Sequence, residues 1–421
     1  MRYMRLKRLT STQVTNGLGL SGAEHVTSDP RYIRITDIAS DGSLRRDIFA
    51  SQPRSVVEDK WVVANDILIA SVGATVGKSY FHNQPGEYCF AGYLSRIRIN
   101  PTLADPKFIY HWTQSRAFWD QVNSQRVSST IENLSAGRIA QFMAPQPPLT
   151  KQKEIADYLD HETAEIDATI VEQSALMGLV HERQSASIDL VYQEAAQQAT
   201  QSRPIKYSFR INPTVNQATR QVPQNSVYLP MSAISEFGKI DTSRSRPTAD
   251  MMGGYTYIEN GDVVVAKVTP CFENGKGAVI AGLPDGLGFA TTEVTNFRSM
   301  GPALPEYLAV VFRTSRFRLG GEAEMTGAGG LRRVPDRYMN NFKIAELNTQ
   351  EQRRLIDRVG EIDRVSHGLA HDLNKAIDFA RERRSALITA AVTGQIDVTA
   401  RHKPAAEQLE DDIAQGLHRE N

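Results

Sequence analysis

The chain has 421 residues, enough for two or three domains with sizeable cores. Its 48 basic and 48 acidic side chains give a formal net charge of zero, which taken alone argues against a binder of nucleic acid or of anionic membranes. The distribution of charge reverses that impression. Residues 1–150 hold 17 basic and 12 acidic side chains, residues 151–200 hold 3 and 10, and residues 201–345 hold 17 and 12. An acidic stretch therefore divides two basic blocks.

Several classes of protein are excluded at this point. The longest apolar runs fall far below the roughly 18 residues that a membrane span needs, which predicts a chain with no membrane partner. The basic residues 1–10 are not followed by the apolar stretch of a signal peptide. The two cysteines, Cys89 and Cys271, cannot form a disulfide framework or a metal cluster, and this favours a cytoplasmic location.

Proline and β-type runs predict the order of the elements along the chain. All 19 prolines lie outside the windows 149–203 and 336–403, which are rich in helix-forming residues. Short β-type runs precede each window, at 33–38, 66–70, 97–99, 227–231 and 262–268. The predicted regions are a mixed α/β domain (1–148), a helix (149–200), a second mixed α/β domain (201–345), a second helix (346–398) and a polar tail (399–421).

The two halves also repeat in sequence. Residues 182–188 (ERQSASI) return as 382–388 (ERRSALI), an offset of 200. Residues 65–70 (NDILIA) resemble 261–266 (GDVVVA), an offset of 196. Such self-similarity indicates a duplicated architecture in which the two domains share a framework and differ in their loops.

Alternating steps of four and three residues define a seam on each predicted helix. Eight of ten seam positions are apolar in the second helix and five of ten in the first, which predicts that the helices pair as an antiparallel coiled coil. The more polar first seam suggests further contacts with another helix or subunit. The expected pairing residues are Ile155, Leu159, Ile166, Leu176, Leu355, Ile362, Leu369 and Leu373. The predicted fold class is therefore α+β, with long helices separating and following two mixed α/β domains.

No motif in the chain predicts catalysis. Residues 73–79 (GATVGKS) resemble a phosphate-binding loop but have three residues, not four, between the first glycine and the Gly-Lys-Ser. His367 and His371 are four residues apart on a predicted helix, but the glutamate and third ligand of a zinc hydrolase are missing. No methyltransferase motif or nucleophile elbow is present. We expect no catalytic residue and no metal site.

Loops that mix cations with amide groups are the candidates for binding DNA. Arginine and lysine can contact phosphate or guanine, and glutamine can pair with adenine. The candidates are Arg45, Arg46, Lys78, Gln125 and Arg126 in the first half and Lys267, Lys276, Arg332 and Arg333 in the second.

Two segments carry a family resemblance. Residues 147–155 (PPLTKQKEI) lead into the first helix, and residues 382–398 (ERRSALITAAVTGQIDV) end the second. With the duplicated layout, these segments resemble the specificity (S) subunit of type I restriction-modification systems over residues 1 to about 400. The start of the second helix departs from the family's Pro-Pro-Leu pattern, because residues 345–352 (AELNTQEQ) keep only a Leu-x-x-Gln spacing.

The resemblance implies that the two mixed domains are target recognition domains, each reading one half of a bipartite sequence in double-stranded DNA, with the helices setting the gap. It also implies two methyltransferase (M) subunits as partners, to which restriction (R) subunits can be added. This chain would bind no cofactor, while its partners would use S-adenosylmethionine, ATP and magnesium. Two alternatives remain open, a coiled-coil scaffold without DNA and a self-contained DNA-modifying enzyme.

Overall fold

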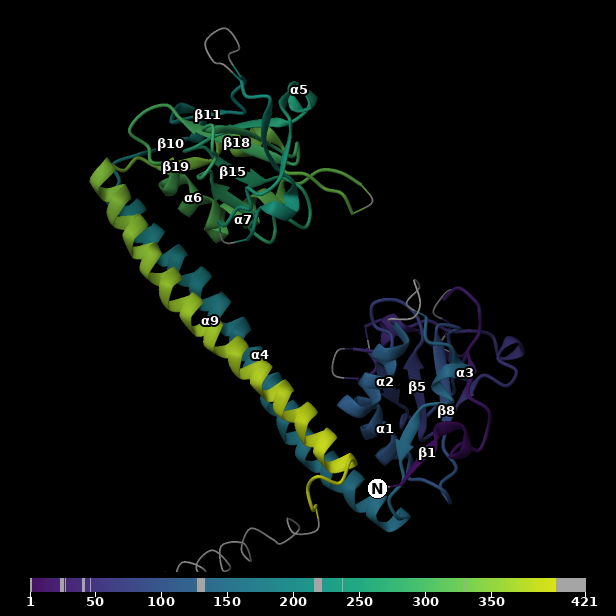
Figure 1. Ribbon diagram of the computed structural model, residues 1–421. Helices are drawn as coiled ribbons and strands as arrows, with labels where there is room; N and C mark the ends of the chain where they lie inside the picture. The colour runs from purple at the N-terminus through teal and green to yellow at the C-terminus, as the bar shows by residue number, and fades with distance from the viewer. Residues whose placement is uncertain are drawn as a thin grey trace, which may run out of the picture. The chain divides into compact units, whose positions relative to one another are not determined.

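The computed structural model describes residues 2–398 except 23–25, 27, 40–41, 46, 127–132, 216–221, 237, 329 and the side chain of Arg126. The chain divides into two compact units (Figure 1). Unit 1 combines residues 1–174 with the chain from residue 375 onward, and unit 2 comprises residues 175–374. Each unit is a mixed α/β fold, which confirms the predicted mixture of elements.

Unit 1 is built on a four-stranded sheet in the order β2-β8-β5-β6, a three-stranded sheet β3-β7-β4 and the pair β1-β9. All these pairs are antiparallel except β3 with β7. The strands are β1 (Tyr3–Arg5), β2 (Thr15–Asn16), β3 (Arg31–Ile33), β4 (Trp61–Val62), β5 (Asp66–Ala70), β6 (Ser79–Phe81), β7 (Tyr88–Phe90), β8 (Leu94–Arg98) and β9 (Met143–Pro145). The helices are α1 (Pro106–Gln114), α2 (Arg116–Arg126) and α3 (Ala136–Ile139).

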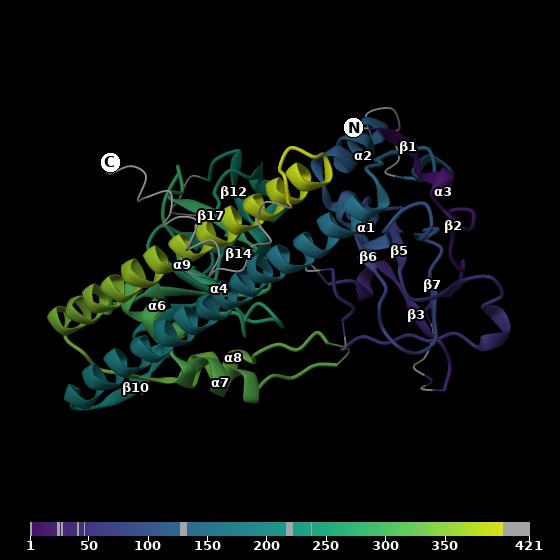
Figure 2. The ribbon, with the colours of Figure 1, turned by 90° about the horizontal axis from the view of Figure 1, so that it is seen from below.

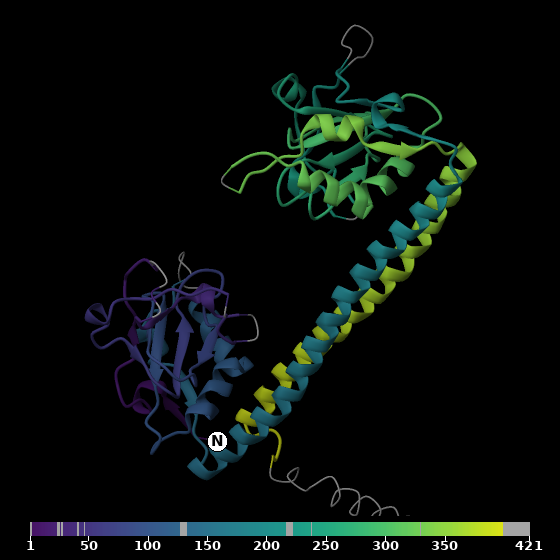
Figure 3. The same cartoon turned by 180° about the vertical axis from the view of Figure 1, so that it is seen from behind.

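Unit 2 repeats this plan with sheets in the orders β11-β18-β15-β16 and β13-β12-β17-β14 and the pair β10-β19. Helix α6 packs against β15 and β16, and Figure 3 shows the yellow-green helices of this unit from behind. The strands are β10 (Ser202–Pro204), β11 (Phe209–Ile211), β12 (Asn225–Leu229), β13 (Ser245–Pro247), β14 (Thr256–Glu259), β15 (Val263–Ala266), β16 (Gly277–Val279), β17 (Leu287–Ala290), β18 (Val294–Ser299) and β19 (Lys343–Ala345). The helices are α5 (Thr248–Met251), α6 (Pro305–Arg313), α7 (Ser315–Ala323) and α8 (Asp336–Asn341).

An ion pair at the start of the central strand is common to both units. Asp66 is buried in unit 1 and accepts two hydrogen bonds of 2.8 Å from the Arg98 guanidinium. In unit 2, Arg298 makes the same two-bond contact with the buried Asp262 at 2.7 Å. A buried carboxylate needs such a partner, so this pair links the two middle strands of each central sheet, β5 with β8 in unit 1 and β15 with β18 in unit 2.

Two long helices, α4 (Leu149–Gln198) and α9 (Thr349–Val392), contribute a segment to each unit, and Figure 2 shows them along their length. In unit 1, Arg384 forms an ion pair with Asp167 at 2.8 Å and Lys151 forms one with Asp397 at 3.2 Å. In unit 2, Gln184 donates to Asp363 at 2.8 Å and Arg358 forms an ion pair with Glu194 at 2.8 Å. Within each unit, a residue further along α4 contacts a residue earlier in the second segment. The paired segments are therefore antiparallel within each unit.

The first turn of each long helix contains a buried glutamine, Gln152 in α4 and Gln352 in α9. Gln152 accepts a hydrogen bond from the Asp105 backbone N–H and donates to the Pro147 carbonyl oxygen, both at 2.9 Å. Gln352 does the same with Leu304 and Leu347, at 2.7 and 2.8 Å. Each glutamine therefore pairs one carbonyl in the turn before its own helix with one N–H at the start of α1 or α6. The equivalent of Gln152 is thus Gln352, not the exposed Gln350 of the Leu-x-x-Gln spacing.

Four of the five predicted β-type runs extend past the carboxyl end of the observed strand; those at 97–99 and 262–268 do so by one and two residues, since β8 ends at Arg98 and β15 at Ala266. The run at 33–38 ends as a strand at Ile33, because residues 35–37 form a 3-10 turn. Buried Asp37 stabilises that turn by accepting from the Arg34 backbone N–H at 2.8 Å. The run at 227–231 ends at Leu229, since Pro230 begins a second 3-10 turn.

A charged network in unit 2 predicts a pH-dependent stability. Asp363 on α9 accepts from Arg313 at 2.6 and 2.7 Å and from Gln184. Burial, the largest single influence, raises the pKa of Asp363, but the hydrogen bonds and charge of Arg313, the hydrogen bond from Gln184 and the nearby His367 together hold the pKa below its usual value. A lowered folded-state pKa stabilises the fold above the unfolded-state pKa of about 3.9, and this is lost as the pH falls through the folded-state pKa.

We therefore expect Asp363→Asn to lower the free energy of unfolding of unit 2 by about 1–2 kcal/mol at neutral pH. As the pH falls through the lowered folded-state pKa, the difference from the wild type should shrink, because the wild-type carboxyl group then becomes neutral as well. Urea denaturation at neutral pH and at acid pH measures this, with Asp372→Asn on the exposed face of the same helix as the control. A deficit of equal size at both pH values would contradict the assignment.

Within the residues that the structure describes, no helix is long and apolar enough to span a membrane.

Candidate nucleic-acid interface

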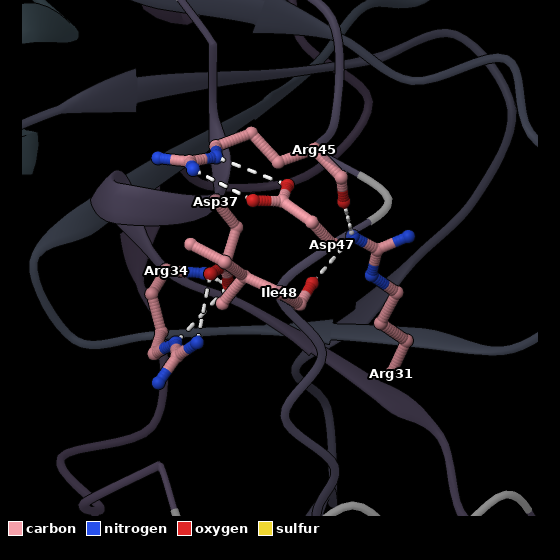
Figure 4. Close-up of polar contacts among 6 residues, drawn as sticks. All are labelled: Arg31, Arg34, Asp37, Arg45, Asp47 and Ile48. Carbon is pink, nitrogen blue, oxygen red and sulfur yellow. Dashed lines mark hydrogen bonds and ion pairs between the residues drawn. The ribbon is translucent and has the colours of Figure 1, made fainter. Parts of the chain in front are cut away.

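In unit 1, the predicted site residues lie around the segment 37–45 and the end of α2. The Arg45 guanidinium binds Asp47 at 2.8 Å, while the Arg45 carbonyl oxygen accepts from Arg31 at 2.5 Å (Figure 4). Lys78, at the start of β6, donates from Nζ to the carbonyl oxygens of Ile38, at 3.3 Å, and Ala39. Arg45 and Lys78 thus meet on one loop, where both also stabilise its conformation.

Two other candidates of unit 1 lie at the end of α2. Gln125 is half-buried near the end of α2, and Arg126 is the last residue of that helix. The side chain of Arg126 and the whole of Arg46 lie outside the described residues.

In unit 2, the structure brings three of the four predicted residues together. The segment 326–334 lies along residues 267–269: Val268 bridges to Arg333, and the Thr269 backbone N–H donates to the Arg332 carbonyl oxygen at 2.9 Å. Lys267 adjoins the same bridge, because its carbonyl oxygen accepts from the Val334 N–H at 2.8 Å. Lys276 lies at the start of β16, and its carbonyl oxygen accepts from the Ala266 N–H at 2.9 Å.

Carboxylates that the sequence did not single out accompany these cations. Arg333 makes two hydrogen bonds to Glu293, at 2.7 and 2.9 Å, and Arg332 lies 3.7 Å from Glu273. The hydrogen bonds from Arg333 hold the pKa of Glu293 below its usual value, so this pair is charged at neutral pH. No spacing signal could have revealed it, because Glu293 and Arg333 are 40 residues apart in sequence.

A cavity of about 520 Å³ in unit 1 adjoins Lys78. Its wall combines Lys78, Tyr110 and Trp119 with the charged helix residues Asp167, Arg381 and Arg384. In unit 2, a cavity of about 620 Å³ is lined by Lys267, Thr292, Asn212, Tyr255 and Tyr257. Each unit therefore has a hollow in which a predicted lysine stands beside aromatic and polar side chains, a combination suited to a nucleic-acid surface.

The expected helix-pairing residues divide into a buried and an exposed group. Ile155, Leu159, Ile166 and Leu355 are buried, and Ile362 and Leu373 are half-buried. Leu176 and Leu369 remain 42% and 44% exposed and line an apolar groove of about 470 Å³ between α4 and α9 in unit 2, together with Ile362 and Leu373. Packing against the mixed α/β part of each unit explains the burial of three of these residues: Ile155 and Leu159 share the unit 1 core, and Leu355 shares that of unit 2.

Comparisons with known proteins agree with this architecture. A family model for the type I restriction modification DNA specificity domain matches residues 32–173. The chain is 36% identical over 156 residues to the type I restriction enzyme EcoAI specificity subunit of Escherichia coli, a match covering 36% of this chain and 26% of that protein. It is 32% identical over 148 residues to the EcoEI specificity subunit of the same organism, covering 35% and 25%. Each match spans only about a quarter of the relative's own length.

The fold is also found in a solved structure. That structure, from work on complex assembly and conformational transition of the type I R-M system, has a TM-score of 0.60 and 12% sequence identity, covering 93% of this chain and 97% of its own. At this identity the likeness shows a shared fold.

These findings first define a class, a duplicated mixed α/β chain that contains a type I restriction modification DNA specificity domain. Over part of its length the chain is similar to the specificity subunits of type I restriction enzymes.

Proposed function

We propose that this chain is the DNA sequence-specificity subunit of a type I restriction-modification complex. The observation that carries the proposal is the match of residues 32–173 to the DNA specificity domain, in a chain whose second unit repeats the same strand order. Two similar units with different loops suit an asymmetric, bipartite target in double-stranded DNA, with each unit acting as a target recognition domain.

We propose that the predicted cations form part of the DNA-facing surface. In unit 2, Lys267, Arg332 and Arg333 gather on one edge, and in unit 1, Arg45 and Lys78 adjoin one loop. The basic balance of both blocks supports this role, because cationic side chains neutralise phosphates. Arg46, Gln125, Arg126 and Lys276 belong to the same proposal on sequence grounds.

The helices would serve as a spacer and as a docking surface. We propose that α4 and α9 pair as an antiparallel coiled coil that sets the gap between the half-sites. The apolar groove at Leu176 and Leu369 supports docking of partner subunits, because exposed apolar side chains in a groove favour burial against another protein. The proposed partners are two methyltransferase subunits, with restriction subunits in the larger complex.

Catalysis would reside in those partners. They would use S-adenosylmethionine, ATP and magnesium, and this chain would carry no cofactor. Among the residues that the structure describes, no group of three or more histidine, cysteine, aspartate or glutamate side chains could hold a metal ion. We propose that the complex acts in the cytoplasm, where the cellular DNA lies.

A map of N6-methyladenine across the genome of cells with and without this chain, each expressing the methyltransferase partner, tests the function. We expect one bipartite motif to be methylated only when the chain is present. The purified complex should also lose at least tenfold in DNA affinity between roughly 50 and 200 mM salt, because phosphate contacts release counterions. Methylation by the chain alone would indicate a self-contained enzyme, and absence of DNA binding would indicate a scaffold.

A further inference from the structure

Both units contain the same backbone arrangement just beyond the central strand. In unit 1, the Ser71 N–H donates to the Tyr93 carbonyl oxygen at 2.9 Å, and the Leu134 N–H donates to the Ser71 carbonyl oxygen at 2.8 Å. In unit 2, the Lys267 N–H donates to the Glu293 carbonyl oxygen and the Val334 N–H to that of Lys267, at the same two distances. We call this arrangement the strand-end frame.

The strand-end frame pairs three positions of unit 1 with three of unit 2. Ser71 corresponds to Lys267 and Tyr93 to Glu293 through the hydrogen bonds. Asn133 corresponds to Arg333, because Asn133 bridges to Val72 as Arg333 bridges to Val268. The backbone is therefore matched residue by residue at these positions.

The side chains at the frame differ although the surroundings are kept. The ion pair of the central sheet, the glutamine before each long helix and the lysine at the start of β6 and of β16 have the same chemistry in both units. At the frame, however, serine, tyrosine and asparagine in unit 1 replace lysine, glutamate and arginine in unit 2. A conserved scaffold with exchanged side chains at matched positions is expected where two copies recognise different ligands.

Apart from Ser71, which is buried, the exchanged side chains are also at least partly accessible. Tyr93 is 65% exposed, and Asn133 is exposed. The side chain of Arg333 is 48% exposed and that of Glu293 30%. Burial in a core therefore does not dictate the identity of these residues, which leaves recognition of a ligand as the reason for an ordered and exposed set.

We propose that the strand-end frame is the base-reading subsite of each unit, in which Arg333 reads guanine and Asn133 reads adenine. This inference rests on the proposed function, since it needs each unit to read one half of a DNA target. It adds the positions that distinguish the two half-sites and the base pair that each position selects.

The geometry of Arg333 fits a guanine reader. Its Nε and Nη2 atoms donate to Glu293 along one edge of the guanidinium. The end-on edge, formed by Nη1 and Nη2, carries two further N–H groups, which match the N7 and O6 acceptors of guanine in the major groove. Glu293 is then a positioning residue that fixes the guanidinium plane. In unit 1, the Asn133 amide can pair with N6 and N7 of adenine, and Tyr93 offers an apolar ring for the thymine methyl group.

The experiment maps methylated motifs in cells that express the methyltransferase partner with the wild-type chain or a variant. Arg333→Ala should reduce the preference for a G·C pair at one position of one half-site by about 10- to 100-fold and leave the other half-site unchanged. Arg333→Lys should lose the same preference while it keeps the charge, because lysine lacks the planar fork. Arg337→Ala is the matched control, since Arg337 is an exposed arginine of unit 2 with a carboxylate partner, Glu324, at 3.2 Å.

A transplant tests the correspondence between the units. Tyr93→Glu combined with Asn133→Arg should introduce a G·C preference into the half-site that Arg333→Ala leaves unchanged. A bipartite wild-type motif that Arg333→Ala and Arg333→Lys both leave intact would overturn the base-reading assignment while the proposed function stands. If the wild-type chain directs no methylated motif, the proposed function fails first. Should Arg333→Ala not fold, the lysine variant and the transplant still decide.

Discussion

Gly17→Ala is expected to destabilise unit 1 by about 3 kcal/mol, near the upper end of the range for a residue forced into a packed interior. A β-carbon at Gly17 would lie 2.0 Å from the Phe90 carbonyl oxygen and 2.5 Å from that of Ala91. Both obstacles are backbone atoms of the β7–β8 connection, so no side chain can rotate away. The neighbouring hydrogen bond from the Leu18 N–H to the Phe90 carbonyl oxygen, 2.8 Å long, would be stretched or broken.

Gly19→Ala is the matched control for that substitution. No heavy atom lies within 4 Å of a β-carbon built at Gly19, so its effect should stay within about 0.5 kcal/mol. Urea denaturation followed by circular dichroism measures both variants. Equal stability of the two would show that the backbone approach at Gly17 is looser than the structure has it. Since Tyr93 follows the same connection, we expect Gly17→Ala also to weaken recognition of one half-site.

Gln352→Ala is expected to cost about 3 kcal/mol, because it leaves two backbone groups, the Leu304 N–H and the Leu347 carbonyl, without their partner in a buried setting. Gln152→Ala should have a similar effect on unit 1, where Gln152 is fully buried. The loss should be seen as a lower urea midpoint for the affected unit.

Gln350→Ala provides the control for that variant. Gln350 is exposed, is the same residue type and lies on the same first turn of α9, so its replacement should change the unfolding free energy by less than about 0.5 kcal/mol. If Gln350→Ala proved as costly as Gln352→Ala, the buried hydrogen bonds would not be the source of the effect.

Much of the secondary structure could be predicted from the sequence because helix and strand formation depends largely on residues that are neighbours in the chain. Proline-free windows and helix-forming residues anticipate α4 and α9, whose first residues are Leu149 and Thr349. The β-type run at 66–70 coincides with β5. The 200-residue repeat anticipates matched elements, and the strand orders of the two central sheets agree element by element.

The features that the sequence did not reveal depend on partners distant along the chain. The strand ends at Ile33 and Leu229 follow from turns that Asp37 and Pro230 stabilise, against the β-propensity of the residues after them. The Leu-x-x-Gln spacing points to Gln350 and not to Gln352 as the equivalent of Gln152. The role of Gln352 becomes visible only in the folded chain, which brings Leu304, 48 residues away, against it. Glu293 and Tyr93 were missed as candidate site residues because no motif marks them. Only the equivalent backbone hydrogen bonds show that they occupy matching positions, one in each unit.

The core of unit 1 imposes an order on biosynthesis. It packs Leu6 and Leu9 from the start of the chain with Ile388, Val392 and Val398 from its far end. Proteins are made from the amino terminus. The core of unit 1 therefore stays incompletely buried until the last turns of α9 leave the ribosome. Unit 2, residues 175–374, is by then fully synthesised. Unit 2 can therefore mature before unit 1, and a truncated chain ending before residue 388 would leave unit 1 open to chaperones and proteases.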